Sequence, residues 1–196
     1  MKNIVTIGRE YGSGGHEIGV KLAERMGFQF YDKDLIAKLA DKLMLPADFM
    51  AEEEKKAFRR NIFNEVIPVF ANGDGSQADY IFAQQGKFIV QLAEEGNCVF
   101  AGRRADYYLR DNPNALHVFL YADMDARTAR IMQLNNCSEE EAAKKIRDMD
   151  KFRKTSYEYT TGRKWGDRHN YDRMLCTSTL GIDACVDELA ALLEKA

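Results

Sequence analysis

The chain has 196 residues, of which 45% are apolar, and this supports one well-buried domain but not two. The formal net charge of -3 argues against a nucleic-acid backbone or an acidic membrane surface as the main partner. No apolar run approaches the roughly 18 residues of a membrane span. The four cysteines form no CxxC pair, so neither a zinc site nor a disulfide framework is indicated. We expect a single cytoplasmic domain over residues 1–196.

Residues 4–19 carry the strongest local signal. A short apolar run from Ile4 predicts a buried strand, and a glycine cluster follows it. The next residues have a helical pattern, with apolar side chains at Ile18, Leu22, Ala23 and Met26. Glycines let the backbone point several N–H groups at an anion, and the positive end of the helix dipole adds to the attraction. The segment predicts a nucleotide phosphate site; a merely structural glycine turn is the alternative.

The loop departs from the P-loop motif GxxxxGK[ST], in which the lysine reaches the β and γ phosphates and the hydroxyl binds Mg²⁺. With Gly14 as the second glycine, Arg9 stands at the first glycine and Gly15 at the lysine. His16 stands at the hydroxyl. Both the charge and the hydroxyl are therefore missing from their usual positions.

A dinucleotide-binding GxGxxG motif fits no better. Gly12 and Gly14 match its first two glycines, but Glu17 stands at the third, where close helix packing beside a pyrophosphate is wanted. Asp32, twenty residues after Gly12, partly supports this interpretation.

Strands alternate with helices along the rest of the chain. Strands are expected at residues 28–31, 98–101, 116–122 and 174–177, and helices at 34–44, 80–95, 124–134, 138 to at least 154, and 182–193. This alternation indicates a parallel sheet with right-handed crossovers. Residues 46–76 are interpreted as an inserted helical excursion, which is as typical of a surface helix pair as of a substrate clasp. Residues 155–170 are interpreted as a loop or short helix that could cover a base.

Charged side chains follow two of the expected strands, on the edge where parallel sheets bind ligands. Asp32 ends the second strand and is either a helix cap or a ligand contact. Arg103 and Arg104 end the third strand, and guanidinium groups there can bind phosphate oxygens bidentately. The alternative is a surface position in which they pair with Asp106.

The later helices add further cations. Arg127 and Arg130 share a helical face and are either solvated or directed at the nucleotide. Ser138 and Glu141 predict a capping box at the start of a helix whose later half, residues 147–154, is strongly charged. Such a helix is either a solvated face or a mobile lid that brings cations over transferring phosphates.

Together these segments resemble the cytidylate-kinase-like branch of the nucleoside monophosphate kinases. The resemblance spans essentially the whole chain and is carried by residues 7–19, 30–36, 101–105, 171–172 and 177–179. It implies an α/β fold: a P-loop NTPase-like three-layer α/β/α arrangement with a five-stranded parallel sheet. It also implies a helical acceptor-binding excursion over residues 46–96 and a helical lid region over residues 138–170.

The resemblance also implies roles for single residues. Arg103 matches the arginine of the family's DGRD segment, which holds the substrate phosphate, although Ala101 replaces the first aspartate. The residues expected to bind the cofactor are Arg9, Gly12, Ser13, Gly14, Gly15, His16 and Glu17. The residues expected to bind the substrate are Asp32, Arg103 and Arg104. The expected catalytic residues are Arg103 and the lid arginines Arg147 and Arg153.

The family's phosphate loop reads GKGT, where this chain has Gly15-His16-Glu17 after Gly14. The missing lysine affects transition-state charge as well as binding. Arg9, Lys33 or a lid arginine are the alternative sources of that charge. Ser13 and Glu17 are the alternatives for Mg²⁺, and the metal ligand is not otherwise assigned.

The resemblance implies a phosphotransferase that uses ATP and Mg²⁺, with CMP or dCMP as the expected acceptor and with no nucleic-acid or membrane partner. One alternative is a non-catalytic nucleotide-binding regulatory module that kept the fold and lost the lysine. A second alternative is a kinase for a small non-nucleotide metabolite on the same fold, and a nicotinamide-dependent oxidoreductase is a more distant one.

Overall fold

A computed structural model describes residues 2–32, 34–43 and 77–195. The helical excursion expected at residues 46–76 lies outside these residues, as does Lys33. The described strands form one parallel sheet in the order β2-β3-β1-β4-β5. Their bounds are β1 Ile4–Arg9, β2 Gln29–Tyr31, β3 Cys98–Ala101, β4 Ala115–Tyr121 and β5 Arg173–Cys176. The five-stranded parallel sheet expected from the sequence is confirmed.

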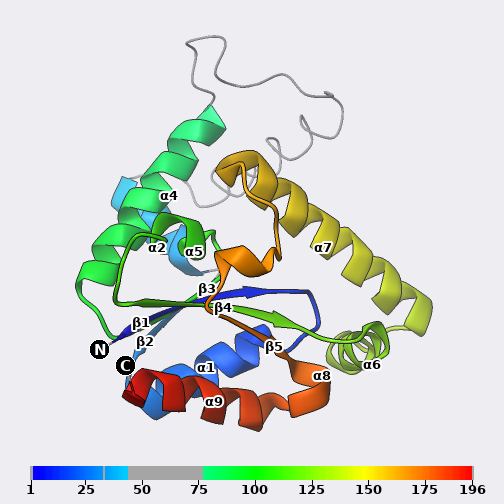
Figure 1. Cartoon of the computed structure of the whole chain (residues 1–196). Helices are drawn as coiled ribbons and strands as arrows, with labels where there is room; N and C mark the ends of the chain where they lie inside the picture. Colours follow the sequence, from blue (N-terminus) through cyan, green and yellow to red (C-terminus); the bar gives the residue numbers. More distant parts are fainter. Residues whose placement is uncertain (1, 33, 44–76, 196) are drawn as a thin grey trace.

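Helices cover both faces of this sheet (Figure 1). Their bounds are α1 Gly15–Met26, α2 Asp34–Leu43, α4 Gln77–Glu94, α5 Ala105–Tyr108, α6 Met124–Asn135, α7 Glu139–Thr161, α8 Thr177–Leu180 and α9 Ile182–Lys195. The helices α1 and α9 lie side by side on one face, and α4 and α5 lie on the other. The three-layer α/β/α arrangement is therefore confirmed. None of the helices in the described part of the chain is long and apolar enough to cross a membrane.

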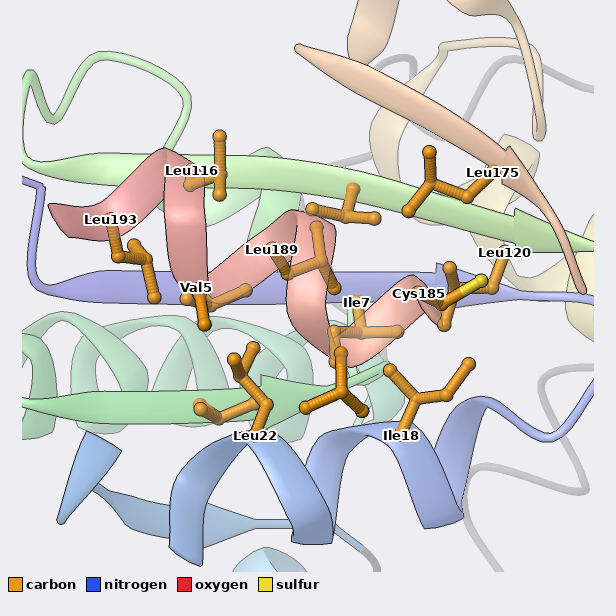
Figure 2. Close-up of a cluster of buried hydrophobic side chains, with 14 of the residues drawn as sticks. Val5, Ile7, Ile18, Leu22, Leu116, Leu120, Leu175, Cys185, Leu189 and Leu193 are labelled. Atoms are coloured by element: carbon orange, nitrogen blue, oxygen red, sulfur yellow. The ribbon is translucent and has the colours of Figure 1, made fainter. Parts of the chain in front are cut away.

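The central strand β1 organises the core because its alternate side chains point to opposite faces. Val5 and Ile7 lie in the larger buried cluster, between the sheet and the helices α1 and α9 (Figure 2). Ile4 lies in the second cluster, which contains Phe100 of β3 and Ile89 of α4. The strands β1, β3 and β4 are buried along most of their length, as expected of parallel strands covered on both faces.

The register brings the carboxyl ends of the strands to one edge. Ile4 of β1 is aligned with Cys98 of β3 and with Ala115 of β4. Because the strands are parallel, the segments that follow β1, β2 and β3 start close together. His117 in β4 is almost fully buried, and its Nδ1 lies 2.8 Å from the Thr6 hydroxyl oxygen. His117 is therefore a residue of the core.

The helices differ from the expectation at the end of α7 and in two short segments. The helix α7 continues to Thr161, whereas residues 155–161 were expected in a loop or short helix. Tyr157 is buried in this extra stretch and its hydroxyl donates to Asp106 of α5, and the helix ends where Gly162 adopts a left-handed conformation, with φ 66°. Both hydrogen bonds of the predicted capping box of Ser138 and Glu141 are present. The four-residue helices α5 and α8 were not predicted.

Candidate active site

The loop between β1 and α1, residues 10–14, turns at two glycines with positive φ. Gly12 has φ 86° and Gly14 has φ 81°, a conformation that other residues rarely adopt. A side chain at Gly12 would also press on α6, because a Cβ there would lie 3.1 Å from the Arg127 carbonyl oxygen. Gly14 precedes α1 and gives it no side-chain cap. The first N–H groups of α1 are therefore left for another acceptor.

Side-chain hydrogen bonds hold this loop in shape. The hydroxyl of Ser13 donates to the Glu10 carbonyl oxygen at 2.9 Å, and Ser13 is buried. The hydroxyl of Thr177, at the start of α8, donates to the Ser13 carbonyl oxygen at 2.8 Å. Ser13 thus stabilises the loop, and its hydroxyl hydrogen is donated within the loop.

Asp32 joins the end of β2 to the start of α1. Its Oδ1 accepts a hydrogen bond from Nη2 of Arg9 at 3.0 Å, and its Oδ2 accepts one from Nδ1 of His16 at 2.7 Å. The Leu35 N–H donates to the backbone oxygen of Asp32 at 3.1 Å, while the two carboxylate oxygens contact Arg9 and His16 respectively. Arg9 and Asp32 have only 15% and 18% of their side chains exposed.

A cavity of about 370 Å³ lies beside this group of charges. Its charged lining consists of Arg9, Asp32, Arg103, Arg104, Asp106 and Arg153. Its apolar and aromatic lining includes Met149, Phe152, Tyr157, Trp165 and Tyr171. The cavity therefore combines several guanidinium groups with a wall of rings from α7 and the segment after it. It is suited to a small anion that also carries a flat or apolar part.

Arg103 and Arg104 both have positive φ, 58° and 59°, which is uncommon outside glycine. Arg104 is buried and makes specific contacts. Its Nη1 donates to the Ser156 hydroxyl at 2.9 Å, its Nη2 donates to Oε1 of Gln85, and its guanidinium lies 4.4 Å from the centre of the Phe82 ring. These contacts fix the Arg104 side chain in the cavity wall.

The two expected lid arginines lie in different surroundings. Nη1 of Arg153 donates to the Arg9 carbonyl oxygen at 2.9 Å, and its guanidinium lies 5.4 Å from the Tyr11 ring. Burial, followed by the nearby charge of Arg9, lowers the pKa of Arg153 to about 10. Arg147 lies on the same helix but is exposed and does not line the cavity. The structure brings Arg153 into the site and leaves Arg147 outside it.

Asp106 and Tyr157 form a buried pair in the cavity wall. The Tyr157 hydroxyl donates to Oδ2 of Asp106 at 2.7 Å. Burial raises the pKa of Asp106, and this outweighs the lowering effect of the hydrogen bonds that the carboxylate accepts. From the sequence, Asp106 was considered only as a partner of the two arginines, and Tyr157 only as a cover for a base. The pattern gives no signal that pairs them.

A second group of charges fastens α7 to the loop. Asp150 accepts a hydrogen bond from the Tyr11 N–H at 2.7 Å and pairs with Arg127 at 2.5 Å. Arg127 also lies 3.6 Å from Glu10, and only 11% of its side chain is exposed. Burial raises the pKa of Glu10 despite this partner. Arg127 is therefore neither solvated nor directed at the cavity.

Arg130 and Glu17 pair beside the loop. The Arg130 guanidinium carbon would lie 3.6 Å from a Cβ at Gly14, and its Nη2 donates to Glu17. This hydrogen bond is the main reason that the pKa of Glu17 lies below its ordinary value. Glu17 also pairs with Lys21 at 3.3 Å. Its carboxylate is thus directed outward, along α1.

The described residues contain no group of three or more His, Cys, Asp or Glu side chains that could hold a metal ion by themselves. Mg²⁺ in phosphoryl-transfer sites does not need such a group, because it keeps several waters and takes one or two carboxylates together with substrate phosphates. The Ser13 hydroxyl donates to the Glu10 carbonyl oxygen, and the Glu17 carboxylate pairs with Arg130. Asp32 and Asp106 are the carboxylates that line the cavity, and Asp32 is the one that also contacts His16 at the start of α1.

Comparison with known proteins places this geometry in a family. A family model described as cytidylate kinase-like matches residues 4–179. The chain belongs to the cytidylate kinase-like family. The family relationship expected from the sequence is thereby confirmed, and it covers the β1–α1 loop, the cavity and α7. A search of the curated proteins finds no match to the chain.

Solved structures agree with this cytidylate kinase-like fold. An uncharacterized protein from Eubacterium ventriosum ATCC 27560 is 27% identical, with a TM-score of 0.76 over 100% of both chains. A shikimate kinase from Acinetobacter baumannii in complex with shikimate is 16% identical, with a TM-score of 0.54 over 100% of this chain and 94% of that one. A shikimate kinase from Bacteroides thetaiotaomicron is 15% identical, with a TM-score of 0.55 over 97% and 98%. The two shikimate kinases show similarity of fold alone.

Proposed function

We propose that this chain is an ATP- and Mg²⁺-dependent phosphotransferase whose acceptor is a small phosphorylated molecule, with CMP or dCMP as the first choice. The observation that carries the proposal is the cavity lined by Arg9, Arg103, Arg104 and Arg153 beside the β1–α1 loop. Phosphoryl transfer requires little covalent chemistry from the protein and much positioning and charge stabilisation. A cluster of guanidinium groups at the carboxyl edge of a parallel sheet can provide both.

The donor phosphates would bind the backbone N–H groups of residues 12–16. Support comes from the two left-handed glycines and from the uncapped N-terminus of α1. Arg130 lies beside Gly14, where its charge favours an anion on the loop. Asp32 would hold Mg²⁺, directly or through water. The ion supplies charge neutralisation between the donor phosphates.

The acceptor would occupy the cavity, with Arg103 on its phosphate. Arg104 would add a second guanidinium, kept in one orientation by Gln85 and Ser156. The helix α7 forms the opposite wall through Arg153 and Tyr157. Because α7 covers the site, it would help to exclude water from the transferring phosphoryl group. We infer that residues 1–196 act as one cytoplasmic kinase-like domain, with residues 138–170 as its lid and residues 46–96 contributing to acceptor binding.

The test is acceptor-dependent release of ADP from Mg·ATP, measured with CMP, dCMP, UMP, AMP, GMP, shikimate and other non-nucleotide alcohols. Arg103→Ala removes the proposed acceptor contact, and Arg110→Ala is the matched control because Arg110 is an exposed arginine that pairs with Asp111. Turnover with CMP or dCMP that falls at least about 100-fold in Arg103→Ala, and not in Arg110→Ala, supports the proposal. Turnover with shikimate or another non-nucleotide alcohol alone would identify a metabolite kinase on the same fold.

A second candidate is a non-catalytic nucleotide-binding module. The observation in its favour is Gly15-His16 at the positions of the P-loop lysine and hydroxyl. This candidate predicts binding of Mg·ATP without acceptor-dependent ADP release. The same panel, combined with a calorimetric titration of Mg·ATP, distinguishes it from the kinase.

A further inference from the structure

The side chain of Arg9 lies across the first residue of α1. A Cβ placed on Gly15 would be 2.9 Å from both Cβ and Cγ of Arg9, and 3.5 Å from its Cδ. These atoms belong to the rigid stem of the arginine and not to its flexible end. Any side chain at residue 15, lysine included, would therefore compete with Arg9 for the same space.

The other end of Arg9 is equally confined. Its guanidinium bonds Asp32 at 3.0 Å, and a Cβ at Gly102 would overlap its Nη1. Arg9 therefore extends from the end of β1 over the start of α1 and reaches the cavity through a passage that two glycines keep open. Burial lowers the pKa of Arg9, and Arg103 lowers it further, while Asp32 opposes both effects. The guanidinium remains charged at neutral pH, because an arginine pKa lies so far above 7.

We propose that Arg9 is the donor-phosphate cation of this site and supplies from β1 the charge that a P-loop supplies from the first residue of its helix. The inference rests on the proposed function and deepens it. It also gives a physical reason why residue 15 is not the lysine of a P-loop, because only glycine there leaves room for the Arg9 side chain. The bond to Asp32 uses Nη2, and an arginine has further N–H donors for phosphate oxygens.

The other candidate cations fit this role less well. Arg153 donates to the Arg9 carbonyl oxygen and lies over the Tyr11 ring, so its position depends on the loop itself. Arg130 pairs with Glu17 on the outer side of Gly14. Of the described cations, Arg9 is the one whose stem occupies the space of a side chain at residue 15.

The test exchanges the two positions. Arg9→Gly, Gly15→Lys and the double variant Arg9→Gly/Gly15→Lys are titrated calorimetrically with Mg·ATP and with inorganic triphosphate, after cooperative thermal unfolding has shown that each is folded. Glycine is placed at residue 9 because the Cβ of an alanine there would still lie 2.9 Å from a Cβ at residue 15. We expect each single variant to bind about tenfold more weakly, Arg9→Gly because it loses the charge and Gly15→Lys because the two stems collide. The double variant should recover binding to within about threefold of the wild type, because the lysine then has room. A double variant that binds no better than the weaker single variant overturns the proposal.

Arg9→Gln keeps the Cβ and Cγ stem of the side chain and an N–H donor while removing the charge. It decides the question if Arg9→Gly does not fold, and Arg110→Gln is its exposed control. Weaker triphosphate binding in Arg9→Gln alone supports the proposal, and unchanged binding overturns it. Binding without turnover in the wild type would sink the proposed function but leave the role of Arg9 to be decided by the titrations. A wild type that binds neither Mg·ATP nor triphosphate overturns both.

Discussion

Asp32 shows how a single carboxylate organises this site. It accepts hydrogen bonds from Arg9 and His16, which belong to different elements, and it lies at the edge of the cavity. Its place after a parallel strand could be predicted from the sequence, because the carboxyl ends of such strands meet at one edge. Its hydrogen-bond partners could not be predicted, because they depend on the position of the Arg9 side chain. That position is possible only because Gly15 and Gly102 have no side chains.

Other residues of the candidate site also differ in how far the sequence predicts their positions. Arg103 and Arg104 could be predicted because two guanidinium groups directly after a buried strand are chemically distinctive. The hydrogen bond of Gln85 with Arg104 could not be predicted, because a glutamine on an amphipathic helix is usually exposed. Here the fold buries it against Arg104. Arg147 and Arg153 have similar surroundings in the sequence. The fold decides which face of α7 lines the cavity, and this leaves Arg147 exposed and brings Arg153 into the lining.

Asp106 leads to a prediction about pH. Because burial raises its folded-state pKa above the ordinary value of 3.8, its contribution to stability is fully present below pH 3.8 and is lost as the pH rises through the folded-state pKa. Asparagine does not titrate and still accepts a hydrogen bond from Tyr157. The free energy of unfolding of Asp106→Asn, measured in urea, should therefore rise relative to wild type between pH 4 and pH 8.

The control for this comparison is Asp148→Asn, which changes an exposed aspartate of α7. Its difference from wild type should be nearly constant over the same range. A difference for Asp106→Asn that is independent of pH, or that moves in favour of the wild type as the pH rises, would contradict the account.

At the scale of elements, α7 is joined to the β1–α1 loop by charged groups and by one small apolar cluster. Asp150 accepts from the Tyr11 N–H, and Arg153 donates to the Arg9 carbonyl oxygen. The Tyr11 ring packs against the cluster that contains Ala142 and Ile146 of α7. Because α7 has few buried side chains for its length, we expect it to open locally more readily than the core helices.

Loss of Asp150 should loosen the contact of α7 with the β1–α1 loop. In Asp150→Asn the Arg127 guanidinium keeps only Glu10 as a charged partner, and the hydrogen bond from the Tyr11 N–H weakens. Trypsin cleaves after the exposed Lys151 and Lys154 of α7 only when the helix opens locally. We expect cleavage there to be about five- to tenfold faster in Asp150→Asn, which corresponds to roughly 1 kcal/mol of local stability. Asp148→Asn is the matched control on the same helix, and equal cleavage rates in both variants would rule out the fastening role of Asp150.

The elements themselves were largely predictable, because their apolar spacing matches their period. The strand β3 runs over the residues expected for it, and the helix α6 differs from its expected range by one residue at its C-terminal end. The helix α7 runs beyond Lys154 through Thr160 and Thr161, which are poor helix formers and whose hydroxyls donate to carbonyl oxygens four residues earlier. Here the buried contact of Tyr157 outweighs local propensity.

At the scale of the whole molecule, the site depends on a sheet that is packed on both faces. The larger cluster joins β1, β3, β4 and β5 to α1 and α9, and Leu189 of α9 lies fully buried at its centre (Figure 2). The carboxyl edge of the sheet can carry several like charges because this core holds the strands in register. Burial is the main reason that the pKa values of Arg9 and Arg153 are lowered, and a neighbouring guanidinium group lowers each of them further.

Leu189→Ala tests how much this buried cluster contributes to the free energy of unfolding. Truncation of a fully buried leucine should lower the free energy of unfolding by about 2–5 kcal/mol, because it removes apolar contacts and leaves a cavity. Leu134→Ala, at a leucine with 66% of its surface exposed, should change it by no more than about 0.5 kcal/mol. Urea denaturation measures both. Equal effects of the two substitutions would show that the cluster around Leu189 does not anchor the sheet.

In the proposed function, donor phosphates bind the backbone of the β1–α1 loop beside the arginine-lined cavity. Amide hydrogen exchange, measured across the chain with and without saturating Mg·ATP, tests this binding. We expect the amides of residues 12–16 to exchange more slowly with nucleotide, because phosphate oxygens accept their hydrogen bonds. Binding of Mg·ATP that leaves these amides unchanged and protects another part of the chain would contradict this proposal.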